Sequence, residues 1–463
     1  MSLVIVGAEI GGGRRADVSV NGGVITAIGT ARPHLGDDVI DADGGALLPG
    51  LHDHHIHLHS LAAMMASTQL GPPVVNDRQA FAAALRLADH VAPADAWLRG
   101  VGYHESVAGH LDANVLDAIV AARPVRVQHR TGGLWILNHR ALDEVSARST
   151  DHPGIERDEL GEPSGRLRRA DQWLRTVVPP TPVDLGRVGR EAAAAGVTGF
   201  TDADPHRDPL AVAHLVAAIT DGTLPQSVHA MGQLGLELPV HRRLTLGPVK
   251  VILDDVALPP IEDLTVTIRA AHAEGRAIAV HCVTRAQLVV ALAALDEAGA
   301  ATGDRIEHGA IIPSECVAEL RRLRLRVVTQ PGFIAERGDQ YRRDVDPDDL
   351  DQLYRCRTLL AAGIPVAGST DAPFTAADPW AAIRAAVVRR TPSGQVLGPR
   401  EAVGPEVALR LFAGSAARPA SHRVAIGAPA ELCLLDEPIA VALSHPHPPN
   451  VVATVIGGEV VHR

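Results

Sequence analysis

Histidine is concentrated in one short stretch near the N-terminus: residues 48–60 read LPGLHDHHIHLHS and contain five histidines. In an extended strand, alternate side chains point the same way, so His55 and His57 should project from one face, with Asp53 and His59 on the same side. Two imidazoles two residues apart on a rigid strand form a compact edge for a divalent metal ion. A histidine-rich surface loop without a specific ligand is the structural alternative.

Four further polar residues interrupt apolar segments later in the chain. A lone strand histidine is ordinarily a hydrogen-bonded core residue, but several residues of metal-binding type call for a shared explanation. If their segments are strands of one barrel, each residue comes late in its strand, and the side chains converge on one face. They are Lys250 in PVKVILDD, His281 in RAIAVHC, His308 in RIEHG and Asp371 in GSTDAP.

Lys250 is the only lysine of the chain, in which lysine and arginine together number 43. A sequence this rich in Ala, Gly and Pro exchanges lysine for arginine wherever a positive charge is sufficient. A lysine amine can lose its proton and react as a nucleophile, whereas a guanidinium cannot. The retained lysine therefore predicts a chemical role at this position. A leftover surface charge is the alternative.

From residue 196 onward, apolar strands alternate with Ala/Leu/Arg-rich helices, a pattern typical of a parallel α/β sheet. Together with the histidine-rich strand they make eight, the number of strands in a (β/α)8 TIM barrel. A Rossmann sheet is the alternative, but no GxGxxG motif stands at a strand–helix turn. The predicted strand segments are 197–204, 226–232, 248–255, 276–283, 305–311, 326–332 and 364–372.

The 463 residues exceed one ordinary core, so we expect a large barrel with a smaller satellite. Short strands with Gly and Asn turns lie near both chain ends, and we expect 1–49 and 402–463 to build one small β-sandwich. The barrel would span 50–401. The long separation of its first two strands predicts a subdomain inserted at 61–190, on the face where barrel active-site loops lie.

Composition restricts the partners and the compartment. The net charge of -11 argues against nucleic acid. No apolar run approaches the roughly 20 residues that cross a bilayer. Four scattered cysteines without a CxxC pair suit a reducing cytoplasm. We expect a cytoplasmic protein that acts on a small-molecule substrate, without a membrane or nucleic-acid partner, and compatible with a homo-oligomer.

These motifs resemble the amidohydrolase superfamily. The pattern P-G-x-x-D-x-H-x-H at 49–57 is followed by a lysine, two histidines and an aspartate in the fourth, fifth, sixth and eighth predicted strands. Within the superfamily the chain is similar to the YtcJ-like (amidohydrolase-3) branch, which includes N-substituted formamide deformylases. The segments with this likeness span nearly the whole chain, among them WLRGVGYHE, RPVRVQHRTGGLWILN, QPGF and AGSTDAPF.

The resemblance implies a binuclear centre with two divalent ions, expected to be zinc. Lys250, carboxylated by CO2, would bridge both ions as a carbamate. In that arrangement His52 and His54 face away from the metals. The implied ligands are His55 and His57 with Asp371 for one ion, and His281 and His308 for the other.

The predicted function is hydrolysis of a C–N bond in an amide, N-acyl or N-formyl compound. A metal-activated hydroxide would attack the carbonyl, with Asp371 as general acid and base. A deaminase is an alternative, although related deaminases place a glutamate three residues after the strand-5 histidine, where Thr284 stands. An ester or lactone hydrolase would use the same residues. A scaffold without metals is a further alternative, but such proteins typically lose ligands, and all six are present.

Other residues are expected to orient the ligands or to contact the substrate. Asp53 and Glu307 are candidates to orient imidazoles. Relatives commonly carry a substrate-side histidine where Gly133 stands, so neighbouring residues would have to replace it. The candidate substrate contacts are Tyr103, His104, His129, Trp135, Arg337 and Tyr341.

Overall fold

The computed structural model divides into two compact units. It describes residues 2–11, 13–93, 95–180, 183–415, 423–445 and 447–463. One unit consists of Met1–Leu58 and Leu185–Arg463, and the other is the inserted His59–Asp184. The C-terminal range predicted for the small sheet domain includes 416–422, which lie outside the described residues.

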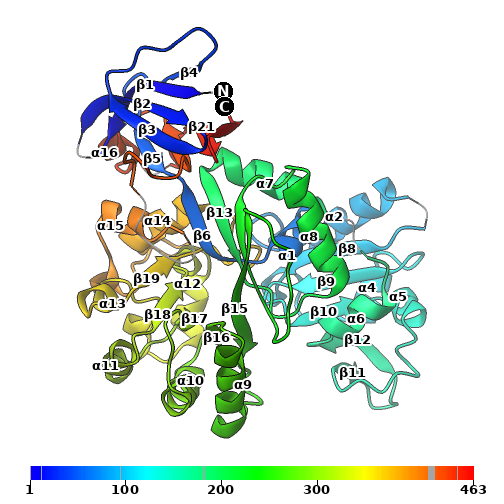
Figure 1. Ribbon diagram of the computed structural model, residues 1–463. Helices are drawn as coiled ribbons and strands as arrows, with labels where there is room; N and C mark the ends of the chain where they lie inside the picture. Colours follow the sequence, from blue (N-terminus) through cyan, green and yellow to red (C-terminus); the bar gives the residue numbers. More distant parts are fainter. Residues whose placement is uncertain (1, 12, 94, 181–182, 416–422, 446) are drawn as a thin grey trace. The chain divides into compact units, whose positions relative to one another are not determined.

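An eight-stranded parallel sheet organises the larger unit (Figure 1). Its strands neighbour one another in chain order, and most of their residues are buried, which explains why they are apolar on both faces. They are β6 (Leu51–Ile56), β13 (Val197–Asp202), β14 (Ser227–Gly232), β15 (Leu244–Ile252), β16 (Ile278–Cys282), β17 (Arg305–His308), β18 (Arg326–Thr329) and β19 (Val366–Gly368).

Helices connect most of these strands. The start of α10 illustrates the local cause: Thr284 and Gln287 form a reciprocal capping box at its N-terminus. Among the described residues, no helix is both long and apolar enough to cross a membrane. The helices of this unit include α7 (Leu185–Ala194), α8 (Pro209–Thr220), α9 (Ile261–Ala273), α10 (Arg285–Ala298), α11 (Ser314–Arg322), α12 (Gly332–Asp344), α13 (Arg357–Ala361), α14 (Pro379–Val388) and α15 (Pro405–Arg410).

The sheet nearly closes between its first and last strands. The N–H of Asp371 donates to the carbonyl oxygen of His55 at 2.8 Å, and the N–H of His57 donates to that of Ala372 at 2.9 Å. These bonds hold the segment after β19 beside the end of β6. The predicted α/β fold is thus confirmed as a nearly closed, eight-stranded parallel barrel.

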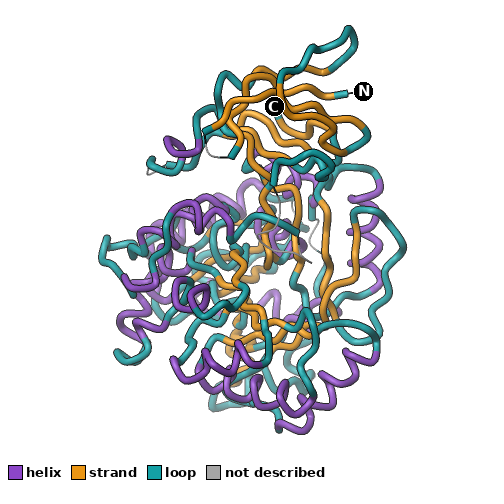
Figure 2. Tube along the Cα trace, turned by 60° about the vertical axis from the view of Figure 1, so that its left-hand side comes forward, coloured by secondary structure: helices purple, strands orange, loops and turns teal. Residues whose placement is uncertain are grey.

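The two chain ends contribute two four-stranded sheets, in the orders β3-β2-β1-β4 and β22-β21-β20-β5. Buried side chains of both sheets, such as Val18 and Leu434, belong to one hydrophobic cluster. Figure 2 shows the strands of these sheets gathered near both termini. Their bounds are β1 (Leu3–Ile10), β2 (Arg14–Asn21), β3 (Val24–Gly29), β4 (Asp38–Asp41), β5 (Leu47–Pro49), β20 (Leu432–Leu435), β21 (Val451–Ile456) and β22 (Glu459–His462).

The inserted unit has a six-stranded sheet of its own, in the order β11-β12-β10-β9-β8-β7. Strands β7, β8 and β9 are parallel, whereas β10, β12 and β11 add antiparallel pairs. Its strands are β7 (Thr68–Gln69), β8 (Leu98–Tyr103), β9 (Val125–His129), β10 (Leu134–Leu137), β11 (Ile155–Arg157) and β12 (Pro163–Arg168). Its helices include α2 (Arg78–Val91), α3 (Glu105–Ala108), α4 (Ala113–Asp117), α5 (His139–Glu144) and α6 (Asp171–Val177).

Candidate metal centre

The histidine-rich stretch forms a strand and then turns into a helix. His55 lies in β6 and His57 follows it, but α1 (Leu58–Met65) begins immediately afterwards. The prediction that His59 continues the same extended face is therefore wrong, because His59 is helical. Because α1 begins at Leu58, only His55 and His57 of the predicted face lie on the extended segment as candidate metal ligands.

The other two histidines of this stretch contact each other. The ring centroids of His52 and His54 are 4.5 Å apart. Nε2 of His52 lies 2.9 Å from the hydroxyl oxygen of Thr201 in β13. His52 thus contributes to the contact between two neighbouring barrel strands.

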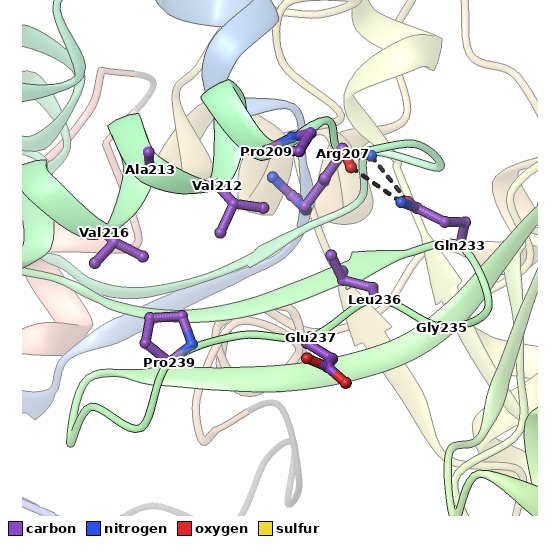
Figure 3. Close-up of a pocket in the computed structure, with 10 residues that line it drawn as sticks. All are labelled: Arg207, Pro209, Val212, Ala213, Val216, Gln233, Gly235, Leu236, Glu237 and Pro239. Carbon is purple, nitrogen blue, oxygen red and sulfur yellow. Dashed lines mark hydrogen bonds between the residues drawn. The ribbon is translucent and has the colours of Figure 1, made fainter.

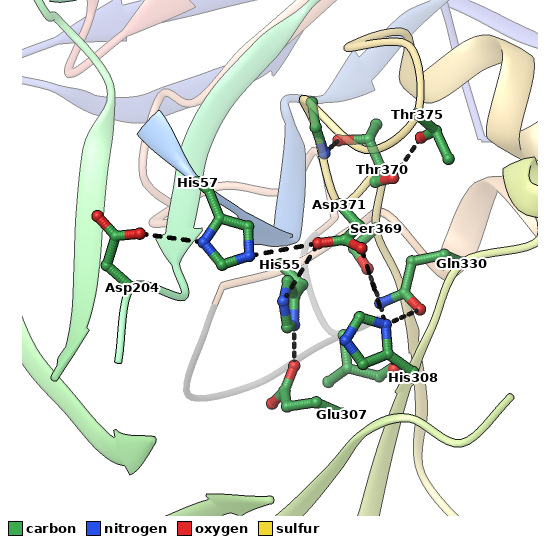
Figure 4. A network of polar contacts seen from close by, with 12 residues as sticks. His55, His57, Asp204, Glu307, His308, Gln330, Ser369, Thr370, Asp371 and Thr375 are labelled. Carbon is green, nitrogen blue, oxygen red and sulfur yellow. Dashed lines mark hydrogen bonds and ion pairs between the residues drawn. The ribbon is translucent and has the colours of Figure 1, made fainter. Parts of the chain in front are cut away.

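Asp371 brings a carboxylate to the paired histidines. Its Oδ1 lies 3.4 Å from Nε2 of both His55 and His57 (Figure 4). Ligand atoms placed about 2.0–2.1 Å from a tetrahedral metal ion are about 3.4 Å from one another. Oδ1 of Asp371 and Nε2 of His55 are buried and make no hydrogen bond. These three atoms therefore fit a shared divalent ion.

The opposite nitrogen of each oriented imidazole has a partner. Nδ1 of His55 contacts Glu307, Nδ1 of His57 lies 3.0 Å from Oδ1 of Asp204, and Nδ1 of His308 lies 2.9 Å from Oε1 of Gln330 (Figure 4). Such partners fix the ring orientation and leave Nε2 for a metal ion.

The remaining predicted ligands gather at the same end of the barrel. Ligand atoms of His55, His308 and Asp371 all lie within 4.8 Å of one another. The ring centroid of His281 is 4.4 Å from that of His308. Nζ of Lys250 is buried and has no hydrogen-bond partner. Burial lowers the pKa of this amine to about 8, although Glu307 and Asp371 oppose the shift.

Two of these residues have a strained backbone. His308 and Asp371 adopt φ angles of 67° and 61°, in the left-handed region that disfavours side chains with a Cβ. Each such conformation costs on the order of 1 kcal/mol and persists only when surrounding contacts enforce it. His308 is the last residue of β17, and Asp371 lies in the segment just after β19, so the strained backbone stands where the chain leaves the barrel strands.

Burial also sets the protonation of the cluster. It keeps the pKa of His55 and His308 well below the ordinary value, so both imidazoles are neutral, the form that binds metal. Burial likewise lowers the pKa of His57, but Asp204 and Asp371 outweigh it and raise that pKa to about 9. The pKa of Asp371 is raised, chiefly by burial.

Sequence reasoning missed two of the orienting residues. Asp204 and Gln330 stand just after β13 and β18, the second and seventh barrel strands. A polar residue late in an apolar strand segment was the pattern that identified Lys250 and the later ligands. Asp204 and Gln330 show the same pattern and could have been identified by it. Asp53, expected to orient an imidazole, accepts hydrogen bonds from Thr370 and from the backbone N–H of His55 instead.

Two predicted substrate contacts lie on α12, which follows β18. Nη2 of Arg337 donates to the carbonyl oxygen of Phe374 at 2.5 Å. The Phe374 ring packs edge-on against His57, with centroids 5.5 Å apart. The hydroxyl of Tyr341 lies 3.1 Å from that of Tyr354. Arg337 is thus linked through one residue to a candidate ligand, while Tyr341 lies in an aromatic cluster.

The other four predicted substrate contacts belong to the inserted unit. Tyr103 and Trp135 are buried, and each donates its polar hydrogen to another residue of the unit. This environment favours a packing role for them. His104 and His129 are partly exposed beside the ends of β8 and β9. For all four, a contact with substrate stays a prediction.

A separate cavity of about 450 Å³ lies between α8 and residues 233–239 (Figure 3). Its walls are mainly apolar side chains, such as Val212 and Leu236, and none of the candidate ligands lines it. Arg207 at its edge pairs with Asp202 at 2.9 Å and lies 4.0 Å from Asp204. The cavity therefore lies next to the charged pair of Arg207 and Asp202, but it does not contain the candidate metal ligands.

The barrel and the cluster together define a class, the hydrolases that use metal ions at the carboxyl ends of a (β/α)8 barrel. The profile of the Amidohydrolase family matches residues 38–462. The chain belongs to this family and is a hydrolase, which confirms the predicted family.

Individual relatives agree with this assignment over nearly full length. The chain is 23% identical to the protein YtcJ of Bacillus subtilis (strain 168), covering 98% of this chain and 97% of that protein. It is 25% identical to the N-substituted formamide deformylase of Arthrobacter pascens, covering 95% and 94%. An uncharacterized metal-dependent hydrolase from Pyrococcus horikoshii OT3 shares the fold, with a TM-score of 0.76 at 19% identity over 96% of this chain and 100% of that one.

Proposed function

We propose that this chain hydrolyses a C–N bond of a small amide, N-acyl or N-formyl compound with two divalent metal ions, zinc in both positions. The observation that carries the proposal is the pair of 3.4 Å distances from Oδ1 of Asp371 to Nε2 of His55 and His57. Such spacing suits tetrahedral ligands, and the opposite ring nitrogens are already occupied. The likeness to a formamide deformylase supports the choice of bond.

The ligands divide into two groups in this proposal. His55, His57 and Asp371 would hold one ion, and His281 and His308 would hold the other. When bound, the ions supply Lewis-acid polarisation of a carbonyl and lower the pKa of water. The remaining steps depend on the chain's own side chains.

Lys250 would help to hold both ions as a carbamate, which forms when its neutral amine adds CO2 and releases one proton to water. Its buried Nζ without a hydrogen-bond partner supports this role, because an ammonium in such a place is poorly stabilised. With a pKa lowered to about 8, the amine is partly neutral near pH 7, and only the neutral amine can form a carbamate.

Asp371 acts as general acid and base. Burial raises the pKa of its carboxyl group, so Oδ2, the oxygen that is not assigned to the metal ion, can hold a proton taken from water and pass it to the leaving nitrogen. Arg337 is the substrate contact best placed to assist, because its charge acts on Asp371 and its guanidinium is fixed to the Phe374 carbonyl.

Deamination is less well supported than hydrolysis of an amide. The third position after His281 is Thr284, whose side chain caps α10 and donates to Asp255 at 2.6 Å. No carboxylate side chain stands at this position to serve the deaminase role.

The four cysteines bear on the compartment of the protein. All four thiols are free and buried, which supports a reducing compartment such as the cytoplasm.

Metal analysis combined with intact mass under non-denaturing conditions tests the proposal on the full chain. We expect two zinc ions per chain that depend on the barrel ligands, and a mass excess of one CO2 that disappears in Lys250→Arg. A matched control is Arg322→Lys, which places a lysine on the exposed face of α11 and should add no CO2. One metal ion that depends on the barrel ligands, with hydrolysis of N-formyl amines surviving Lys250→Arg, would overturn it.

A substrate panel tests the bond that is cleaved. N-formyl and N-acyl amines should be hydrolysed, whereas aminopurines and cytosine should be unchanged. Activity on simple esters and lactones but on none of the amides would assign the same centre to C–O bonds instead.

A further inference from the structure

The inserted unit brings two histidines and a glutamate together at the carboxyl end of its parallel strands. β8 and β9 are parallel neighbours, and Tyr103 at the end of β8 pairs in register with His129 at the end of β9. His104 and Glu105 follow β8 directly. Ligand sites of α/β sheets commonly lie beyond the carboxyl ends of such strands.

The three side chains present their donor atoms to one point. One donor atom each of His104, Glu105 and His129 lies within 4.8 Å of the other two. Nε2 of His129 is 3.0 Å from Oε2 of Glu105, and the imidazole centroids of His104 and His129 are 5.7 Å apart. Two imidazoles bound through Nε2 to one zinc ion would have centroids roughly this far apart, given Zn–N distances of about 2.0–2.1 Å.

The second nitrogen of each ring is held by a neighbouring hydroxyl. Nδ1 of His104 lies 2.9 Å from Oγ of Ser106, and Nδ1 of His129 lies 2.8 Å from Oγ1 of Thr131. Each Nδ1 also accepts a backbone N–H, from Ser106 at 3.2 Å and from Thr131 at 3.3 Å, so the position of both rings is fixed. Binding of zinc through Nε2 requires the ring proton to move to Nδ1, where the neighbouring hydroxyl oxygen can accept it. The Glu105 side chain is 45% exposed, so an ion can reach the cluster from solvent.

We propose that His104, Glu105 and His129 form a divalent-metal site, preferring zinc, that shares no residue with the barrel centre. Two imidazoles and one carboxylate are a ligand set that zinc accepts, with a fourth position left for water. The site does not depend on the proposed reaction. It gives His104 and His129 a ligand role in place of direct substrate contact. A simple ion pair between His129 and Glu105 is the rival explanation.

Zinc titration of the full chain separates the two explanations. In a background with the five barrel ligands other than Lys250 replaced, His55→Asn/His57→Asn/His281→Asn/His308→Asn/Asp371→Asn, calorimetry at micromolar zinc should still detect one binding site per chain. Adding His104→Asn/His129→Asn should abolish it. His139→Asn is the matched control, because His139 pairs with Asp117 at 2.6 Å in the same unit, but no third metal-binding side chain of the described residues joins this pair.

The proposal is overturned if the background chain binds no zinc, or if binding is unaffected by the two additional substitutions. Should the background chain fail to fold, the zinc content of the otherwise unaltered protein decides. His104→Asn/His129→Asn should then lose one zinc ion per chain with unchanged circular dichroism, and unchanged zinc content would overturn the site. An unaltered chain that binds zinc at His104, Glu105 and His129 but none at the barrel ligands would contradict the proposed function and support this site.

Discussion

The carboxylate of Asp53 accepts the backbone N–H of Thr370 at 3.1 Å, although 317 positions separate the two residues. The Thr370 hydroxyl donates to the other carboxylate oxygen, and the N–H of His55 donates to Asp53 at 3.2 Å. One buried side chain thus ties the first barrel strand to the segment after the last. Asp371, next in the chain, is thereby held opposite the paired histidines.

Replacement of Asp53 should weaken both the barrel and its cluster. Asp53→Ala leaves three buried donors without acceptor, at a cost of about 2–3 kcal/mol in the free energy of unfolding. Chemical denaturation of the metal-free protein measures this loss. Asp53→Asn retains a carbonyl oxygen for the Thr370 N–H, so its loss should be smaller. Equal stability of Asp53→Ala and the unaltered chain would contradict the role.

Replacement of Asp204, which contacts Nδ1 of His57, should lower the affinity for metal more than it lowers the free energy of unfolding. Asp204→Ala frees Nδ1 of His57, and loss of such a partner typically lowers metal affinity about 10–100-fold. Competition with a chelator measures the affinity. Asp221→Ala, at the exposed C-terminal end of α8, is the matched control and should leave it unchanged. An unchanged affinity in Asp204→Ala would show that Asp204 does not orient the ligand.

A histidine can be introduced at the position where relatives commonly carry one. A Cβ added to Gly133 meets no atom within 4 Å, so Gly133→His should change the free energy of unfolding by less than about 0.5 kcal/mol. If the absent histidine limits substrate binding, kcat/KM for N-formyl amines should rise, chiefly through KM. Gly133→Ala controls for the altered backbone. Identical kinetics in both variants would assign substrate binding to other residues.

Glu431 should make the folded protein less stable as pH rises, whereas a carboxylate stabilised by salt bridges or hydrogen bonds makes it more stable. Burial raises the pKa of Glu431 from 4.5 to about 7. Oε1 accepts the N–H of Gly457 at 3.0 Å, whereas Oε2 is buried without a hydrogen bond. Because the folded pKa is the higher one, the folded chain holds the proton more firmly, and its stability falls as pH rises from about 4.5 through 7.

Replacement of Glu431 by glutamine should remove this dependence. Glu431→Gln keeps an acceptor for Gly457 and carries no charge, so it should stabilise the protein by about 1–2 kcal/mol at pH 8 after allowance for solvent screening, and little at pH 5. Denaturation of both proteins at the two pH values measures the difference. A gain of the same size at both would trace the effect to packing instead of charge.

Local patterns identified the strands and the principal candidates. Apolar segments of strand length between helical segments were sufficient to place all eight barrel strands, and β16 and β17 begin within two residues of the predicted segments. The isolated Lys250 and the spacing of His55 and His57 were visible because residue type and short-range spacing are properties of the sequence itself. The same reasoning failed at His59, because the start of α1 competes with the extended pattern.

What the sequence by itself determined was the alternation of elements and the set of residues able to bind metal. Only the tertiary structure decided which partners orient them. Glu307 contacts His55 across 252 positions, and Gln330 reaches His308 from the next strand. These pairings follow from strand register and barrel closure. Such long-range geometry arises from the packing of the whole sheet, so no local spacing encodes it.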